Sequence, residues 1–171
     1  MAKIAFIVDS ASGIRKGQYD NVYVIPLVIT IKDESGNIKE YKDGIDINET
    51  KVHEAINNKK CDVKTSQASV GEIINMVESI YDQYDKIYAI PIHTKLSTAI
   101  NTWNMIKDDY PKLTVLPTTD FACGVVWNIQ HLLALAKNNQ LTDNVALEYM
   151  TNTYKHRNGI LFVYDLTQLA K

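Results

Sequence analysis

The sequence predicts an α/β protein with a mostly parallel, open sheet and helices on both of its faces. Two observations support this fold class. Residues 4–8 and 86–91 are short, mainly apolar runs without polar alternation, which is typical of strands buried on both faces. Segments with apolar residues at helical spacing separate such runs, and the alternation of strands and helices is characteristic of parallel sheets.

Length and composition restrict the class of protein. A chain of 171 residues can bury a real core, so residues 1–171 are expected to form a single α/β domain. The net charge of -2 provides no basic excess for binding nucleic acid. The first apolar run ends at Asp9, too early for a membrane span or a signal peptide, which predicts a cytoplasmic protein without membrane insertion.

Motifs for cofactors and metals are absent from the sequence. Cys61 and Cys123 stand alone, without a cysteine or histidine at a zinc-binding spacing. There is no G-x-G-x-x-G fingerprint and no Walker A sequence. We therefore expect no cofactor, no metal site and two reduced thiols.

The first half of the chain contains a predicted hairpin. Residues 22–31 have the composition of a strand, and Pro26 within them indicates an edge or a bulge, because proline cannot donate to a ladder. A turn over residues 34–37 leads to a returning strand over residues 38–41. Asn48 is a suitable N-cap for the short helix that follows.

The second half alternates helices and strands. Pro111 ends one helix, Asp120 is expected to cap another, and Asp143 is expected to begin a third. The predicted elements are, in order, a helix over residues 73–84, a strand over 86–91, a helix from residue 99, a strand over 113–116, a helix over 125–136, a helix from residue 143 and a last strand over 160–163.

The segment from Lys64 to Glu72 separates a polar, irregular stretch from the helix over residues 73–84. Ser69 and Glu72 have the spacing of a capping box, in which each side chain accepts the backbone N–H of the other residue. A helix start presents N–H groups and the positive end of the helix dipole, which suits a carboxylate or a phosphate. The alternative is that Thr65 and Ser66 are simple turn residues before the cap.

Hydroxyl side chains recur in three predicted loops between a strand and a helix: residues 65–66, 94–98 and 118–119. Such loops gather along the carboxyl edge of a parallel sheet, where ligands bind in open α/β folds. Asp9 and Ser10 end the first strand at the same edge, with a turn or a cap as their alternative role. Neutral donors at helix starts suit an anionic head group.

Arrangements for catalysis are sparse by comparison. His93 is the histidine nearest to these loops, and as a general base it would support a hydrolase or a phosphotransfer-related enzyme. A solvated or capping histidine is the alternative. The sequence G-x-S-x-G is absent, and no carboxylate pair has the spacing of a catalytic dyad. We therefore favour binding over catalysis at this edge.

Several short motifs follow one another in a specific order. Lys64–Ser69 is close to K-T-S-Q-P-S, with Ala68 at the proline, and Leu96-Ser97 falls at L-S-G-T, with Thr98 at the glycine. The further motifs are Ile7–Ser10, Val24–Leu27, the Y-x-D-G-x-D-I of Tyr41–Ile47 and the F-V-x-D-L-x-x-L of Phe162–Leu169. In this order they resemble the N-terminal domain of the DegV family of bacterial fatty-acid-binding proteins.

The resemblance implies a carrier rather than an enzyme. Members of the family hold a long-chain fatty acid by its carboxylate and present it to a separate fatty acid kinase. Transferred to this sequence, Thr65 and Ser97 would donate hydrogen bonds to the carboxylate, with Ser66 close by. Further candidates near the site are Ser10, His93 and Thr98.

The family normally continues into a second domain of comparable size that covers the acyl chain, whereas this sequence ends at Lys171. A partner, or a second copy of the chain in a homodimer, would then complete the lipid tunnel on the face left open. The alternatives are an interaction or regulatory module that has kept the fold without the ligand, and a phosphotransfer-related enzyme that uses His93.

Overall fold

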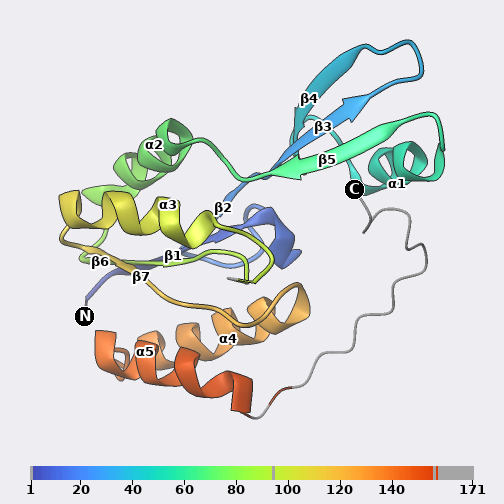
Figure 1. Ribbon diagram of the computed structural model, residues 1–171. Helices are drawn as coiled ribbons and strands as arrows, with labels where there is room; N and C mark the ends of the chain where they lie inside the picture. The colour runs from blue at the N-terminus through green and yellow to red at the C-terminus, as the bar shows by residue number, and fades with distance from the viewer. Residues whose placement is uncertain (1, 94, 156, 158–171) are drawn as a thin grey trace.

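The computed structural model describes residues 2–93, 95–155 and 157, and it confirms the predicted α/β class. A parallel sheet lies between two helix layers, and a small antiparallel sheet with one helix stands beyond one end of it (Figure 1). The strands are β1 (Ile4–Asp9), β2 (Val22–Ile25), β3 (Val28–Lys32), β4 (Ile38–Lys42), β5 (Asp62–Ser66), β6 (Lys86–Ile90) and β7 (Leu113–Val115). The helices are α1 (Glu49–Asn57), α2 (Val70–Tyr81), α3 (Ala99–Ile106), α4 (Cys123–Lys137) and α5 (Asp143–Asn152).

The parallel sheet has the strand order β2-β1-β6-β7, so β1 is paired on both of its edges. The apolar run of β1 explains this position, because Phe6 and Ile7 are fully buried and adjacent strand residues point to opposite faces. Ile7 belongs to a core with Val77 of α2 and Trp103 of α3. Phe6 belongs to a second core with Ile129 of α4. Helices therefore cover both faces of the sheet, as predicted.

The strand predicted over residues 22–31 is wrong as a single element, because the chain forms two strands in different sheets. Strand β2 pairs in parallel with β1, whereas β3 pairs antiparallel with both β4 and β5. Pro26 stands at the break, and it has no N–H with which to continue the parallel ladder. The predicted hairpin of β3 and β4 is confirmed.

Strand β5 lies where the sequence pattern predicts only irregular polar structure. Thr65 pairs with Ile29, and Ser66 pairs with Val28, in an antiparallel ladder. The strand is at an edge of the small sheet, and its last three residues are exposed. An exposed edge strand needs no apolar alternation, since pairing with β3 rather than burial holds it in place.

Several predicted helix starts are confirmed. Asn48 caps α1 with its side-chain oxygen, and Ser69 and Glu72 form the predicted capping box at α2. Helix α5 begins at Asp143, one residue after its cap, Thr142. Ordinary capping chemistry is local, which is why the sequence is sufficient to locate these helix starts.

The prediction that Asp120 caps α4 is wrong. Helix α4 begins at Cys123, and Ala122 occupies the cap position without a side-chain hydrogen bond. Asp120 is engaged elsewhere, because its carboxylate accepts a hydrogen bond from Asn128 Nδ2 at 2.8 Å. The helix predicted over residues 73–84 ends earlier, at Tyr81. The last predicted strand, over residues 160–163, lies outside the described residues.

Helices long and apolar enough to cross a membrane do not occur within residues 2–93, 95–155 and 157.

The capping box of α2 gives a prediction for the pH dependence of stability. The Lys42 ammonium, 2.9 Å from Glu72 Oε1, and the hydrogen bonds from Ser69 lower the pKa of Glu72 from 4.5 to about 2. A lowered carboxyl pKa stabilises the folded state above the unfolded value, so this contribution is lost as the pH falls from about 4.5 toward 2. We expect Glu72→Gln to flatten the pH dependence of the free energy of unfolding in that interval, measured by urea denaturation.

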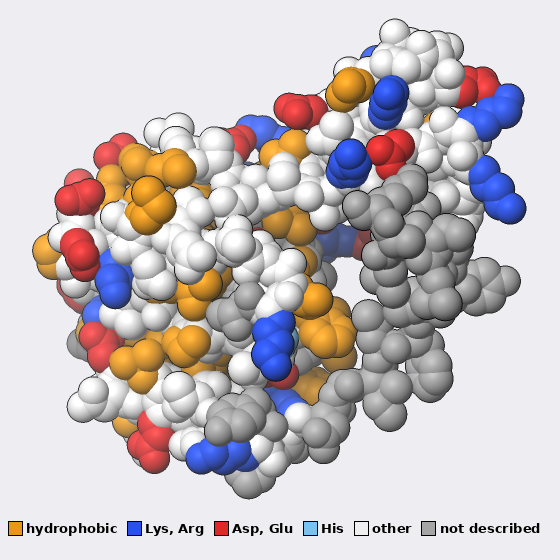
Figure 2. Space-filling model, in the orientation of Figure 1, with side chains coloured by type: hydrophobic (Ala, Val, Ile, Leu, Met, Phe, Trp, Pro, Cys, Tyr) orange, Lys and Arg blue, Asp and Glu red, His pale blue; other side chains and the backbone are white. Residues whose placement is uncertain are grey.

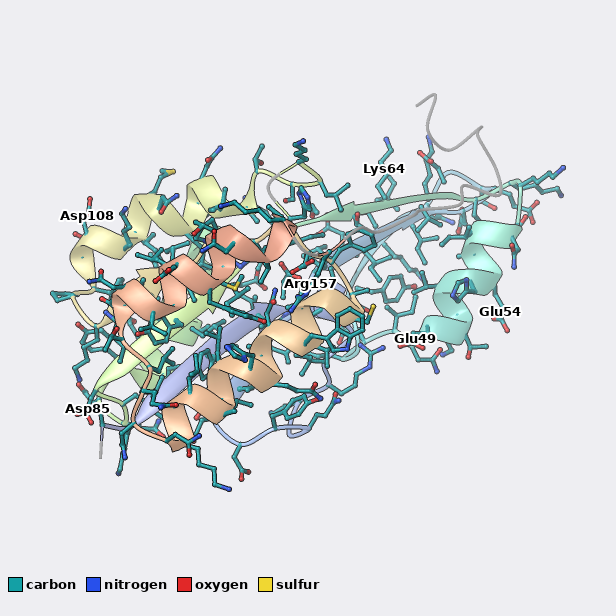
Figure 3. The ribbon with its side chains drawn as sticks, turned by 90° about the horizontal axis from the view of Figure 1, so that it is seen from below. Glu49, Glu54, Lys64, Asp85, Asp108 and Arg157 are labelled. Carbon is teal, nitrogen blue, oxygen red and sulfur yellow. The ribbon has the colours of Figure 1, made fainter. Side chains whose placement is uncertain are left out.

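The control removes a different carboxylate, with Glu54→Gln on the exposed surface of α1 (Figure 3). Unfolding free energies of wild type and Glu72→Gln that run parallel from pH 2 to pH 6 would contradict the role assigned to Glu72.

Candidate functional site

The carboxyl edge of the parallel sheet brings together two of the predicted loops. The β6–α3 loop and the β7–α4 loop lie at the same end of the sheet, on the side of the small antiparallel sheet (Figure 1). The third hydroxyl-bearing segment, Thr65 and Ser66, is not a loop but the end of β5. Strand β5 runs back toward this edge before the chain enters α2 (Figure 1).

Asp9 and Ser10 stand at the end of β1 and are almost completely buried, with exposed fractions of 7% and 5%. Asp9 Oδ2 accepts the Ile92 N–H at 2.6 Å, and Ser10 Oγ accepts the Leu27 N–H at 3.0 Å. Burial raises the pKa of Asp9 to about 6, although hydrogen bonds from the Ile92 and Ala11 N–H groups act in the opposite direction. The hydroxyl oxygen of Ser10, which the sequence predicts near a ligand, thus accepts a hydrogen bond from the backbone of Leu27.

His93 organises the β6–α3 loop. Its Nδ1 accepts the Lys95 N–H at 2.9 Å, and its backbone oxygen accepts the N–H groups of Leu96 and Ser97. An imidazole that accepts through Nδ1 carries its proton on Nε2 when it is neutral, so Nε2 is a donor rather than a base. This geometry favours a structural or donor role over general-base catalysis.

Ser97 lies two residues before α3 and is half-buried. Its Oγ accepts the Ala99 N–H at 3.1 Å, and a hydroxyl that accepts in this way keeps its own proton for donation. Thr98 is exposed at the cap position and makes no side-chain capping bond. Its φ of -87° is open to any residue, so threonine at this position strains nothing.

Thr65 and Ser66 point to opposite faces of the small sheet, because successive strand residues alternate. Thr65 shares its face with its partner Ile29, which is buried. Ser66 is on the other face, where it lines a pocket of about 350 Å³ together with Lys42 and Glu72. The two hydroxyls therefore cannot serve one ligand from the same face of the strand.

Gln67 connects the end of β5 to α3. Its Nε2 donates to Thr102 Oγ1 at 2.7 Å, and the next residue, Ala68, is buried in the core shared with α2 and α3. Gln67 Oε1 is buried without a partner among the described residues. The bond holds the segment that follows Thr65 against the helix that follows Ser97.

The start of α2 does not offer the anion site that its capping box suggests. Glu72 accepts hydrogen bonds from the Ser69 backbone N–H and the Ser69 hydroxyl, each at 2.9 Å, and pairs with Lys42. The helix's own carboxylate thus occupies the position of an external anion. The start of α3, where Thr98 forms no cap, is the open alternative.

A polar network that the sequence pattern does not predict supports the β7–α4 loop. Arg157 Nη1 lies 3.0 Å from Asp120 Oδ2 and 2.7 Å from Asn128 Oδ1, and Figure 3 shows Arg157 beside α4. Asn128 is fully buried. A Cβ atom on Gly124 would stand 2.8 Å from the Asp120 Cβ, so glycine is needed there. Contacts between such distant residues leave no periodic signal in the sequence.

Large hydrophobic side chains are exposed at the same edge. Leu96 in the β6–α3 loop is 60% exposed, and Trp127 in the first half of α4 is 53% exposed. Phe121 in the β7–α4 loop is 38% exposed. Figure 2 shows hydrophobic surface at the end of the larger layered part that faces the small sheet. Hydroxyl donors and apolar surface therefore occur together, which suits an amphiphilic ligand.

Residues that could hold a metal are not grouped in the described part of the chain, where no three His, Cys, Asp or Glu side chains come together.

The sequence is similar to that of one protein family. A family model described as "Uncharacterised protein, DegV family" matches residues 3–171. A DegV domain-containing protein of Mycoplasma genitalium is 31% identical over 171 residues, which cover 98% of this chain and 59% of the relative. One of Mycoplasmopsis pulmonis is 36% identical over 146 residues, which cover 84% and 49% of the two chains.

Solved structures have the same fold. A fatty-acid-binding DegV protein of Bacillus subtilis aligns over 91% of this chain and 55% of its own, with a TM-score of 0.77 and 18% identity. A DegV family protein of Thermus thermophilus, described with fatty acid binding, aligns over 90% and 54%, with a TM-score of 0.76 and 20% identity. The chain thus spans little more than half of these proteins. From the match to the family model and the curated relatives, the chain belongs to the DegV family.

Proposed function

We propose that this protein binds a long-chain fatty acid by its carboxylate, with Thr65 and Ser97 as hydroxyl donors. The observation that carries the proposal is the state of Ser97. Its oxygen accepts the Ala99 N–H, its proton is available, and it lies at a helix start that Thr98 leaves without a side-chain cap. A donor at the positive end of a helix suits a carboxylate.

The position of Thr65 supports a second donor from the opposite side. The bond between Gln67 and Thr102 holds the end of β5 against α3, so the chain after Thr65 and the helix after Ser97 share one location. Hydrogen bonds to a charged group contribute about 1.5–3 kcal/mol each. Two such donors would fix the head group, while Ser66, on the other face, belongs to the neighbouring pocket.

The exposed side chains of Leu96, Phe121 and Trp127 supply an apolar surface against which the first part of an acyl chain can pack. Each buried methylene contributes about 0.8 kcal/mol, so most of the affinity for a long-chain acid comes from its tail. Solved relatives support this class of ligand: the Bacillus subtilis protein is a fatty acid binding protein, and a protein of Eubacterium ventriosum binds stearic acid.

The same proposal includes the partners that the sequence resemblance implies. A second polypeptide surface, either a further domain or another copy of the chain in a homodimer, would cover the acyl chain over these exposed residues. A fatty acid kinase in the cytoplasm would take the bound acid as its substrate. The protein itself would act as a carrier without catalysing a reaction, in keeping with the turn-forming role of His93 Nδ1.

Substitution of the two donors tests the head-group site. We expect Thr65→Ala and Ser97→Ala each to weaken oleic acid binding about tenfold, because each removes a hydrogen bond to a charged group. The measurement is displacement of a bound fluorescent fatty acid, cis-parinaric acid, by oleic acid. Ser66→Ala should change the affinity little, because the strand register places Ser66 on the opposite face of β5 from Thr65. Thr50→Ala, on the exposed surface of α1, is the control.

If Ser66→Ala lowers the affinity for oleic acid and Thr65→Ala does not, the ligand lies on the Ser66 face of β5, which contradicts the proposal. A wild-type protein that binds no cis-parinaric acid and carries no lipid by native mass spectrometry would instead indicate the alternative function, an interaction module without a ligand.

Comparison of head groups tests whether the carboxylate is recognised at all. We expect methyl oleate to bind at least tenfold more weakly than oleic acid at pH 8, because the ester cannot present a charged oxygen pair to the Thr65 and Ser97 hydroxyls. Isothermal titration in the same detergent-free buffer measures both affinities. Equal affinities would show that only the apolar tail is bound, and the hydroxyl site would then be rejected.

A further inference from the structure

The proposed carboxylate site has two walls, the β6–α3 loop with Ser97 and strand β5 with Thr65. They are attached to Asp9, the last residue of β1, and to Ser10, the residue directly after it. Asp9 accepts the N–H of Ile92, the second residue of the β6–α3 loop, at 2.6 Å. Ser10 accepts the N–H of Leu27, the residue before β3, at 3.0 Å. Both side chains are buried, so neither bond exchanges readily with water.

Each bond leads directly to one of the proposed donors. Ile92 is followed by the turn in which the His93 oxygen accepts the Ser97 N–H at 3.2 Å. Leu27 is followed by β3, whose Ile29 is the ladder partner of Thr65. The ladders of β1 end nearby, at Ile90 in β6 and Ile25 in β2, so the side chains of Asp9 and Ser10 extend the attachment beyond the sheet.

We propose that Asp9 and Ser10 are positioning residues that set the spacing between the β6–α3 loop and strand β5, and thereby the distance between the Ser97 and Thr65 hydroxyls. This inference rests on the proposed function, since it deepens the description of the same site. Neither role requires contact with the ligand, because each bond acts on the backbone of a segment that leads to one of the two donors.

A neighbouring serine provides the comparison. Ser12 is also buried, at 2% exposed, and its hydroxyl donates to the Asp9 backbone oxygen at 2.7 Å and accepts the Ile14 N–H at 3.2 Å. Its hydrogen bonds therefore stay inside the turn and reach neither wall. Ser10 and Ser12 are alike in size and burial. They differ in that Ser10 bonds the distant Leu27, whereas Ser12 bonds only neighbours in its own turn.

The experiment compares Ser10→Ala with Ser12→Ala by oleic acid titration, in 171-residue chains that circular dichroism shows to be folded. We expect Ser10→Ala to weaken binding about tenfold, which corresponds to about 1.4 kcal/mol, and Ser12→Ala to change it less than twofold, even where both lower the melting temperature alike. Equal affinities in the two variants would overturn the role of Ser10.

Rescue by a conservative side chain tests Asp9. Asparagine keeps a carbonyl oxygen for the Ile92 N–H, whereas alanine does not, so Asp9→Asn should bind within threefold of wild type and Asp9→Ala about tenfold more weakly. Loss of binding in Asp9→Asn equal to that in Asp9→Ala would overturn positioning through this bond. If Asp9→Ala does not fold, the serine pair and Asp9→Asn still decide the outcome.

Amide NMR signals distinguish this inference from the proposed function. In the ligand-free protein, Ser10→Ala should shift the signals of residues 63–67 and Asp9→Ala those of residues 95–98, with Ser12→Ala affecting neither group. If wild type binds no fatty acid, the proposed function fails, and these shifts alone decide whether the two residues set the walls. If wild type binds and the shifts are absent, the positioning role is rejected while the function stands.

Discussion

The constraint on which the rest of the structure depends is the position of β1, paired in parallel on both edges and buried on both faces. A strand in that position must be mainly apolar, and the pairing of β1 extends to Ile25 of β2 and Ile90 of β6. The end of β1 is consequently held by ladder pairs to β2 and β6. Asp9 and Ser10 are the first polar residues after the apolar run. Their side chains attach the surrounding loops to the end of β1 by accepting hydrogen bonds from the N–H groups of Ile92 and Leu27.

The proposed binding site follows from this construction. Loops are tolerant of sequence, but a carboxylate needs donors at fixed separations, so the loops have to be held by a rigid element. Here one donor comes from the β6–α3 loop and one from a strand of a different sheet. Buried hydrogen bonds at the strand end, the Gln67–Thr102 bond and the Arg157 network each brace one of the segments at this edge.

The sequence predicts the parts of the fold that have local causes. The unbroken apolar run of Ile4–Val8 and the Ser69–Glu72 spacing both have the structures expected of them. It does not predict β5, because Thr65 and Ser66 are exposed and are ordered by pairing with β3. Nor does it predict the contact of Asp120 with Arg157, since residues 37 positions apart leave no periodic trace. Candidate donors are thus found from motifs, whereas the faces they occupy require the structure.

The central claim is that Thr65 and Ser97 hold one carboxylate between two walls fixed by β1. A crystal structure of the 171-residue chain grown with oleic acid tests it most directly. We predict carboxylate density within hydrogen-bonding distance of both hydroxyls, with the acyl chain leaving across Leu96 and Phe121. A carboxylate bound instead beside Ser66 and Lys42, or an acyl chain seated on another surface, would contradict the claim.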